Sequence, residues 1–127
     1  MSRLKSTKPI ALTEVELEMM RILWDRGPST VRDIQENLPL GRVLAYTSIS
    51  TIVRILEQKE FVIAQKAGRG HLYAALVPRE QYEALALSQL VDNVFHGEPA
   101  LLVERLLSAT KLSALDIDEI RQMISGK

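Results

Sequence analysis

Apolar residues recur at spacings of three and four in the first third of the chain, which predicts two short helices. The first covers about residues 13–26, from the capping-box sequence Thr13–Glu16 to the breaker pair Gly27-Pro28. The second covers about residues 30–38, with Asp33 placed to complete another capping box. Both patterns leave one apolar stripe, so the two helices are expected to pack on a common core.

A third helical pattern, from about Ala45 to Lys59, separates two chemically different faces. One face is aliphatic and suits burial against the first two helices. The opposite face is a narrow polar stripe without an acid, made of Thr47, Thr51, Arg54 and Gln58. A stripe that is only solvated more often mixes Lys with Glu, so this one favours contact with a polyanion.

Two β-rich segments follow, at residues 61–66 and 71–76. Gly68 and Gly70 flank Arg69, so the connecting turn can adopt positive φ and present the arginine at its tip. Three helices followed by a hairpin with a basic tip is the element order of a winged helix-turn-helix. In that fold the third helix enters the major groove of DNA.

A second region, residues 78–127, has a helical pattern throughout and should form three helices. In Ala100–Leu107 six of eight residues are apolar, too many for a two-turn helix with one solvated side. We therefore favour burial in a homodimer over the alternative, in which the tail completes a single monomeric core. The residues expected at the dimer interface are Leu90, Val94, Phe95, Leu102, Leu106, Ile117, Ile120 and Ile124.

The predicted fold is mainly α with a small β-hairpin wing, in two parts. Residues 1–77 would form a winged-helix DNA-binding domain and residues 78–127 a three-helix dimerisation region. Short hydroxyl side chains allow close approach and arginine can read guanine, so the expected base or groove contacts are Thr47, Ser48, Thr51 and Arg54. The expected phosphate contacts are Ser29, Thr30, Arg42, Tyr46, Lys66 and Arg69.

The total charge of the 127-residue chain is uninformative, but its distribution supports this interpretation. Sixteen Lys and Arg balance sixteen Asp and Glu, and a net charge of zero by itself argues against a nucleic-acid partner. Residues 1–77, however, hold eleven basic and eight acidic residues, whereas residues 78–127 hold five and eight. The excess of positive charge therefore lies in the region that is expected to bind DNA.

Two further expectations follow from the composition. The chain has no cysteine, which excludes a disulfide framework and thiolate metal sites. Residues 1–12 lack the apolar region of a signal peptide, and no apolar run is long enough to span a bilayer. We therefore expect a soluble cytoplasmic protein that does not insert into a membrane.

Other functions are less well supported by the sequence. No set of nucleophile, base and acid stands out, so neither an enzyme nor a cofactor is expected. Asp92 and His96 have a metal-ligand spacing, with Glu98 nearby, but His96-Gly97 is typical of a helix C-terminus and no metal site is expected. The remaining alternative is a winged-helix protein-interaction module that does not bind DNA.

Several segments together resemble the penicillinase repressor (BlaI/MecI) family of bacterial winged-helix regulators. The matching segments are Leu12–Glu16 continuing through Met20, Leu23 and Trp24; Thr30–Ile34; Ala45–Ile49 with Thr51 and Arg54; Gly68-Arg69 with Tyr73; Phe95–Gly97; and Leu112-Ser113. The resemblance implies a homodimer that binds a palindromic operator and represses resistance or stress genes. It also implies inactivation through a membrane sensor protease or, in a copper-responsive branch, by metal.

Three departures from the family pattern limit what the resemblance implies. The copper branch uses C-terminal cysteines, which this chain lacks, so copper sensing of that kind is excluded. Arg105-Leu106 stands where the cleaved repressors carry Asn-Phe, so that cleavage does not carry over directly. Glu60 stands where a glycine commonly ends the recognition helix, which should mildly disfavour phosphate contacts.

Overall fold

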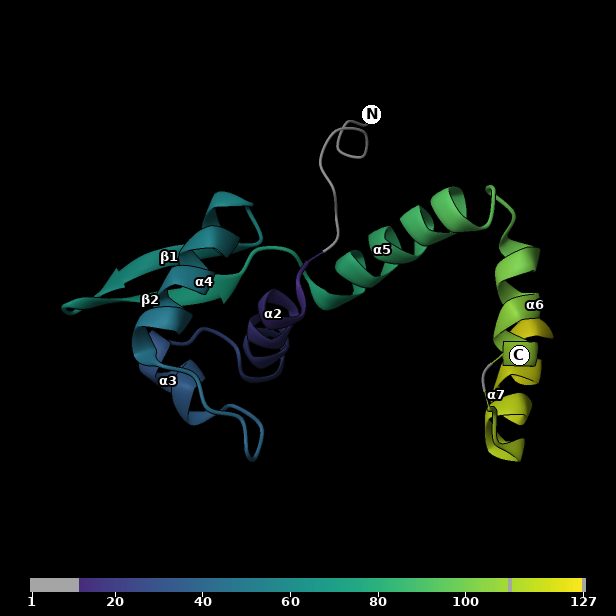
Figure 1. Ribbon diagram of the computed structural model, residues 1–127, viewed down its shortest axis with the longest axis horizontal. Coiled ribbons are helices and arrows are strands. Elements are labelled where there is room, and N and C mark those ends of the chain that lie inside the picture. The colour runs from purple at the N-terminus through teal and green to yellow at the C-terminus, as the bar shows by residue number, and fades with distance from the viewer. Residues whose placement is uncertain (1–11, 110, 127) are drawn as a thin grey trace. The chain divides into compact units, whose positions relative to one another are not determined.

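The computed structural model describes residues 12–109 and 111–126. The helices and strands of the sequence patterns appear in the expected order (Figure 1). The elements are α2 (Glu14–Arg26), α3 (Val31–Glu36), α4 (Tyr46–Gln58), β1 (Val62–Ala67), β2 (Gly70–Ala75), α5 (Arg79–Val94), α6 (Pro99–Ala109) and α7 (Ala114–Ile124). The mainly helical fold with a β-hairpin wing is thereby confirmed. The expectation about a signal peptide concerns residues that lie almost entirely outside the described ones.

Reciprocal hydrogen bonds fix the beginning of three helices, and those of α2 and α3 were predicted from the sequence. At α2 the backbone N–H of Glu16 donates to the Thr13 hydroxyl, and the Thr13 N–H donates to the Glu16 carboxylate. The same arrangement opens α3 with Thr30 and Asp33, and opens α7 with Ser113 and Asp116. Each capping box satisfies two N–H groups that the helix itself cannot pair.

Helix α3 is shorter than the sequence pattern suggested. It ends at Glu36, because the Asn37 N–H donates to the carbonyl of Ile34 in a tighter turn. The Asn37 side chain also donates to the carbonyl of Asp33, at 2.7 Å. Leu38 therefore follows the helix and packs on the core from the loop that leads to α4.

Helix α4 ends in a Schellman arrangement without the usual glycine. The N–H of Phe61 donates to the carbonyl of Leu56, and the N–H of Glu60 donates to the carbonyl of Glu57. Glu60 occupies the left-handed position, with φ of 67°. A side chain at this position costs free energy that glycine would not, so the Schellman geometry is maintained against a local strain.

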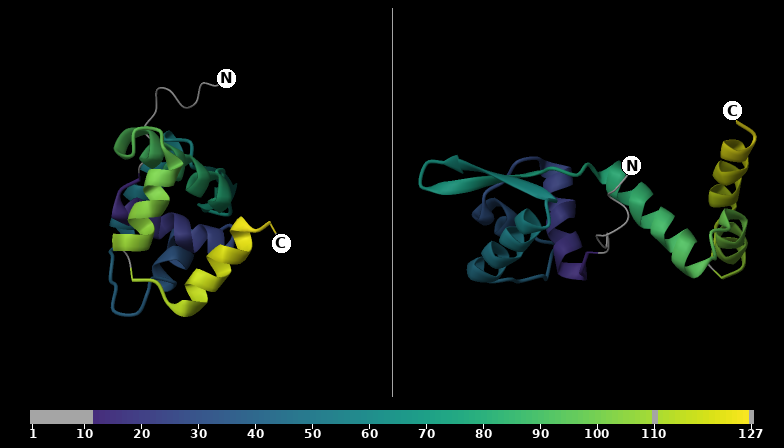
Figure 2. Two further views of the ribbon diagram at one scale, coloured as in Figure 1. Left: turned by 90° about the vertical axis from the view of Figure 1, so that its right-hand side faces the viewer. Right: turned by 90° about the horizontal axis from the view of Figure 1, so that it is seen from above.

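Strands β1 and β2 pair in antiparallel register from Val62↔Ala75 to Ala67↔Gly70, which leaves Gly68 and Arg69 as a two-residue turn. Gly68 has φ of 61°, the positive value that a two-residue hairpin with glycine first requires. Figure 1 shows the hairpin turn extending beyond α3 and α4, and Figure 2 shows the same from above. An isolated bridge between Ser29 and Tyr73 connects the start of α3 to the wing.

The core of the fold lies where α2, α3 and α4 meet the hairpin. Met19, Met20, Ile34, Ile49, Val53 and Leu56 are fully buried there. Val62 and Tyr73 extend this cluster into the two strands. The aliphatic face predicted for α4 is thus the face that packs, and its polar stripe remains outside.

The chain divides into two compact units. One, here called the head unit, ends at Ala86, and the other, the tail unit, begins at Leu87. The division into a DNA-binding and a dimerisation region at residue 77 stays a prediction about function. No described residue of α5, α6 or α7 is buried in the single chain.

Candidate nucleic-acid interface

Two adjoining grooves lie between α4 and the wing. The first, about 560 Å³, is lined by Ser50, Arg54 and Glu57 of α4 and by Ala64, Lys66, His71 and Tyr73 of the strands. The second, about 460 Å³, reaches the start of α3 and is lined by Thr30, Val31, Arg32, Tyr46, Ser50, Ala67, Arg69, Gly70, His71 and Tyr73. Both are open to solvent, as a surface that receives an extended ligand must be.

Ion pairing separates the basic residues of the head unit into two groups. Four of its nine described Lys and Arg residues pair with acids: Arg26 with Asp33, Arg42 with Glu18, Lys59 with Glu16 and Arg79 with Asp25. The other five form no ion pair with a described residue, and four of these line the grooves: Arg32, Arg54, Lys66 and Arg69. Glu57 is the only acid among the described residues that line either groove. The uncompensated positive charge is therefore concentrated on one face.

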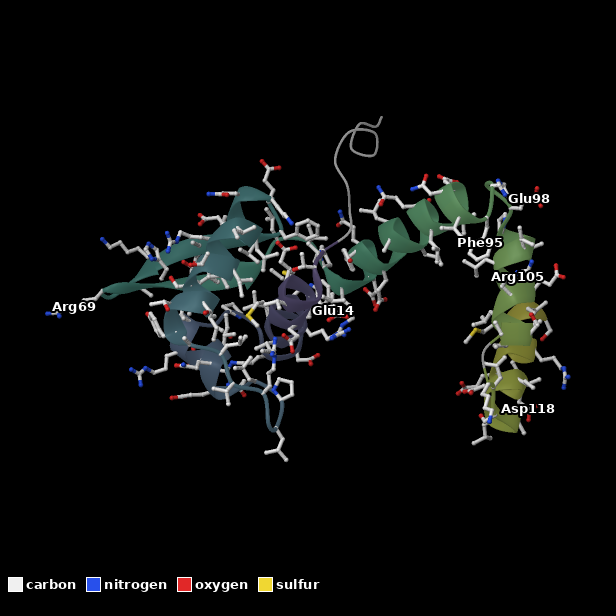
Figure 3. The ribbon with its side chains drawn as sticks, viewed as in Figure 1. Glu14, Arg69, Phe95, Glu98, Arg105 and Asp118 are labelled. Carbon is white, nitrogen blue, oxygen red and sulfur yellow. The ribbon has the colours of Figure 1, made fainter. Side chains whose placement is uncertain are left out.

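Arg69 lies at the tip of the wing, and Figure 3 shows its side chain directed away from the rest of the hairpin. Lys66 is two residues before the turn and is exposed on β1. A flexible cation at a hairpin tip can follow the phosphate backbone without reading bases. The roles of Lys66 and Arg69 as phosphate contacts stay predictions.

The polar stripe of α4 is exposed, as the sequence predicted. Thr47, Ser48, Thr51 and Arg54 all lie on the solvent side of the helix. The Thr51 hydroxyl donates to the carbonyl of Thr47 at 3.0 Å, so its oxygen is left as an acceptor. The stripe thus combines hydroxyl acceptors with one free guanidinium donor, a set that suits base edges.

Tyr46 and Tyr73 contribute different chemistry to the grooves. Tyr46 opens α4 and is about half exposed, at 51%. Tyr73 is nearly buried, at 6%, and burial together with the negative charge of Glu57 raises its pKa above the ordinary value. The phenol of Tyr73 therefore stays neutral and adds no negative charge to the face.

Ser29 and Thr30 are not free to bind a phosphate in the predicted way. Ser29 is fully buried: its N–H donates to the carbonyl of Tyr73 at 2.9 Å, and its hydroxyl donates to the carbonyl of Gly27 and accepts from Arg26. Thr30 caps α3 with its hydroxyl, and its own N–H donates to Asp33. Hydrogen bonds from Thr30 lower the pKa of Asp33, so a carboxylate stays charged at this helix start and opposes a phosphate there.

Arg42 is also engaged elsewhere. Its guanidinium makes a two-pronged contact with Glu18, with Nη2 and Nε each within 3.0 Å of a carboxylate oxygen. This hydrogen bonding and the charge of Glu18 raise the pKa of Arg42. Arg42 also lines a separate pocket with Glu14, Leu17 and Arg21 on α2, away from the grooves beside the wing.

Five polar groove residues were not among the expected DNA contacts: Arg32, Ser50, Glu57, His71 and Tyr73. Arg32 lies in α3 and reaches the groove only through the tertiary contact between α3 and the wing. Ser50 lies on the side of α4 that faces the strands, next to the polar stripe. A helical wheel of all α4 residues, drawn with the hairpin beside it, would have identified Ser50 as a groove residue. Nothing in the sequence around Arg32 indicates that it lies in the groove.

The tail unit exposes a large number of apolar side chains in the single chain. Leu90, Val94, Leu106, Ile117 and Ile124 are between 39% and 77% exposed. Phe95, Leu102 and Ile120 are partly covered. Helix α5 ends at Val94, and His96 has φ of 55°, so Asp92 and His96 do not share a helical face. Figure 3 places Phe95, Glu98 and Arg105 in this unit.

A profile of the family described as penicillinase repressor matches residues 12–126. The chain belongs to the penicillinase repressor family. Members of this family are transcriptional regulators, and the chain is accordingly a regulator of the DNA-binding repressor type and not an enzyme. The resemblance carried by the sequence motifs is thereby confirmed.

Several relatives of this penicillinase repressor homologue are known. It is 36% identical to the transcriptional regulator BlaI of Mycobacterium tuberculosis over 88 residues, 68% of this chain and 62% of that protein. It is 29% identical to an uncharacterised 16.5 kDa protein of Latilactobacillus sakei, covering 91% of this chain and 80% of that one. The methicillin resistance regulatory protein MecI of Mammaliicoccus sciuri is 23% identical, and the match covers 94% of this chain and 98% of that protein.

Among solved structures, a mutant of ZitR from Lactococcus lactis is similar over 97% of this chain and 80% of that chain. The sequence identity is 16% and the TM-score is 0.42. Within the described residues, none of the helices has both the length and the apolar character needed to cross a membrane.

Proposed function

We propose that this penicillinase repressor homologue acts as a homodimer that binds a palindromic operator and represses resistance or stress genes. Helix α4 would enter the major groove, where Thr47, Ser48, Thr51 and Arg54 read base edges. Arg32, Lys66 and Arg69, with Tyr46 at the groove margin, would contact phosphates. Ser29, Thr30 and Arg42 are left out of this interface because their polar groups are buried or paired.

The sorting of positive charge carries this proposal. Basic residues elsewhere in the head unit are mostly neutralised by acids, whereas Arg32, Arg54, Lys66 and Arg69 have no such partner among the described residues. Leaving four cations unpaired around two open grooves has an electrostatic cost that a polyanionic ligand would offset. Duplex DNA matches because its phosphates flank a major groove wide enough for one helix.

Dimerisation is supported by the exposed apolar surface of the tail unit. Leucine, isoleucine and valine side chains exposed by 39% or more on α5, α6 and α7 need a partner of the same character. A second copy of the chain supplies it through a two-fold interface, in which the same patch meets itself. Two heads related by a two-fold axis would then read an inverted repeat.

The inducing signal is part of the same proposal. As the family resemblance implies, a membrane sensor protease or its downstream signal would release the repressor. Arg105 and Leu106 lie in α6, and Arg105 is exposed. A protease acting here would have to recognise a basic residue before the leucine, so its specificity would differ from that for Asn-Phe.

Selection of genomic fragments on the purified protein, followed by footprinting, tests the proposal. We expect enrichment of fragments that share an inverted repeat, with protection of two half-sites. Affinity should fall steeply as salt rises, because neutralised phosphates release counterions. No enrichment over random DNA would favour the alternative, a winged-helix module that binds a protein partner.

A further inference from the structure

Helix α5 crosses the boundary between the two units. Its residues Arg79–Ala86 belong to the head unit, and its remainder, Leu87–Val94, belongs to the tail unit. The contacts that hold the first two turns of α5 therefore lie within the head unit.

Trp24, near the end of α2, holds the start of α5 by two kinds of contact. Its indole Nε1 donates to the carbonyl of Val77 at 2.9 Å, just before the helix begins. The guanidinium carbon of Arg79 lies 5.3 Å from the centre of the Trp24 ring, within the range of a cation–π interaction. Arg79 also pairs with the carboxylate of Asp25, the next residue of α2.

One turn further along α5, Tyr82 completes the cluster. Its ring centre lies 5.8 Å from that of Trp24 and 6.0 Å from that of Phe61, with the Phe61 ring nearly perpendicular at 70°. Phe61 belongs to the buried core, so these contacts connect α5 to the interior of the head unit. Trp24 therefore contacts the segment before α5, its first residue and its fourth.

We propose that Trp24 and Arg79 are positioning residues, which fix the first turns of α5 on the head unit and so set the separation of the two heads in the dimer. This inference rests on the proposed dimeric function. Half-sites that differ by one base pair in spacing differ in rotation around the DNA axis, because about 10 base pairs make one turn. A rigid exit of α5 would make binding depend sharply on that spacing.

The contacts are suited to this role because none of them touches the grooves beside α4. Neither Trp24 nor Arg79 lines either groove, so changing them leaves the groove residues in place. Removing the contacts should leave binding to one half-site unchanged. Only the free-energy cost of placing both heads on two half-sites at the same time should change.

The test compares the parent with the double variant W24F/R79Q, which keeps an aromatic ring but removes the indole donor and the guanidinium. Variant Y82F is the matched control, because it retains the ring that makes the described contacts. Each protein is titrated with duplexes carrying one footprinted half-site, and with both half-sites at spacings changed by single base pairs. Spin labels on an engineered Q65C report the head-to-head distance without DNA, since the chain has no other cysteine.

We expect the parent and Y82F to lose about tenfold in affinity when the spacing is changed by two base pairs, and W24F/R79Q to lose less than about threefold. We also expect a broader spin-label distance distribution for the double variant, with unchanged affinity for the single half-site. Parent-like spacing dependence and distance distribution in the double variant would overturn the proposal. If W24F/R79Q fails to fold, R79Q alone carries the same test, because Arg79 is at the surface.

Failure of this inference is distinguishable from failure of the proposed function. If the parent binds no duplex, or is a monomer, the repressor proposal fails. If the parent binds both half-sites cooperatively but the variants keep its spacing profile, only the positioning role fails.

Discussion

The Glu16 carboxylate accepts two hydrogen bonds from the Lys59 ammonium, at 2.8 and 2.9 Å, and so joins the first turn of α2 to the residue that caps the end of α4. Glu16 is 6% exposed and also accepts the N–H of Thr13 in the capping box. The C-terminal end of the proposed recognition helix is therefore held by an acid that belongs to the core of the head unit. Glu18 holds the loop before the same helix through Arg42.

Replacing Glu16 by glutamine should destabilise the protein by about 1 to 2 kcal/mol, because the Lys59 ammonium loses its charged acceptor. Chemical denaturation measured on the parent and E16Q provides the value. E18Q is the matched control, since its pair with Arg42 is more exposed and should contribute only about 0.5 kcal/mol. Equal losses in the two variants would argue against a special role for the Glu16 pair.

The same pair predicts a pH dependence. Burial acts to raise the pKa of Glu16, but the hydrogen bonds from Lys59 and Thr13 and the Lys59 charge outweigh it, so the pKa lies below its ordinary value. A carboxyl with a lowered folded-state pKa stabilises the fold above its ordinary pKa and loses this contribution as the pH falls through the folded value. The stability difference between parent and E16Q should therefore be full at neutral pH and shrink in acid, which denaturation across about pH 3 to 7 would reveal.

Replacing Glu60 by glycine should raise the stability by about 1 kcal/mol, because Glu60 has φ of 67° in the left-handed region that glycine adopts without strain. The midpoint temperature of thermal unfolding should rise by a few degrees. E60A removes the carboxylate but keeps a Cβ, so it separates charge from backbone strain. An equal gain in E60A would show that the charge, and not the backbone, was responsible.

The sequence predicted the helices well because their signals are local. The three capping boxes need only residues three positions apart, and the Gly68 turn needs only a glycine between two β-rich segments. Two of the assignments that changed, Ser29 and Arg42, depend on partners far along the chain: the Ser29 N–H donates to the carbonyl of Tyr73, and Arg42 pairs with Glu18. Arg32 was missed for the same reason, since only the tertiary fold brings α3 beside the wing.

Arg54 and Arg69 should have different effects on DNA binding. R54A should cost about 1 to 3 kcal/mol at particular base pairs and relax specificity there, because a guanidinium on α4 can read guanine. R69A should weaken binding to all sequences alike, because the wing tip contacts phosphate. Binding to a set of operators with single base changes distinguishes the two patterns. If R54A and R69A lost affinity in the same pattern across this set of operators, the proposed roles of both residues would be wrong.

Arg32 and Arg42 form a matched pair that tests charge sorting. Both are exposed arginines of the head unit, but of the two only Arg42 is paired with a described acid. R32A should weaken operator binding and lower the salt dependence by about one phosphate contact, whereas R42A should change both little. If R42A weakened operator binding more than R32A did, Arg42 would belong to the DNA interface and Arg32 would not.

The decisive measurement is the slope of log Kd against log salt for operator binding by the parent and by the triple variant R32A/K66A/R69A. The three residues line the two grooves and have no acidic partner among the described residues. If each residue contacts one phosphate, the magnitude of the slope should be smaller by about 2.7 in the triple variant, at about 0.9 per contact. The fold of the triple variant should be the same as that of the parent. A triple variant that binds the operator with the parent's affinity and slope would contradict a DNA interface at this face.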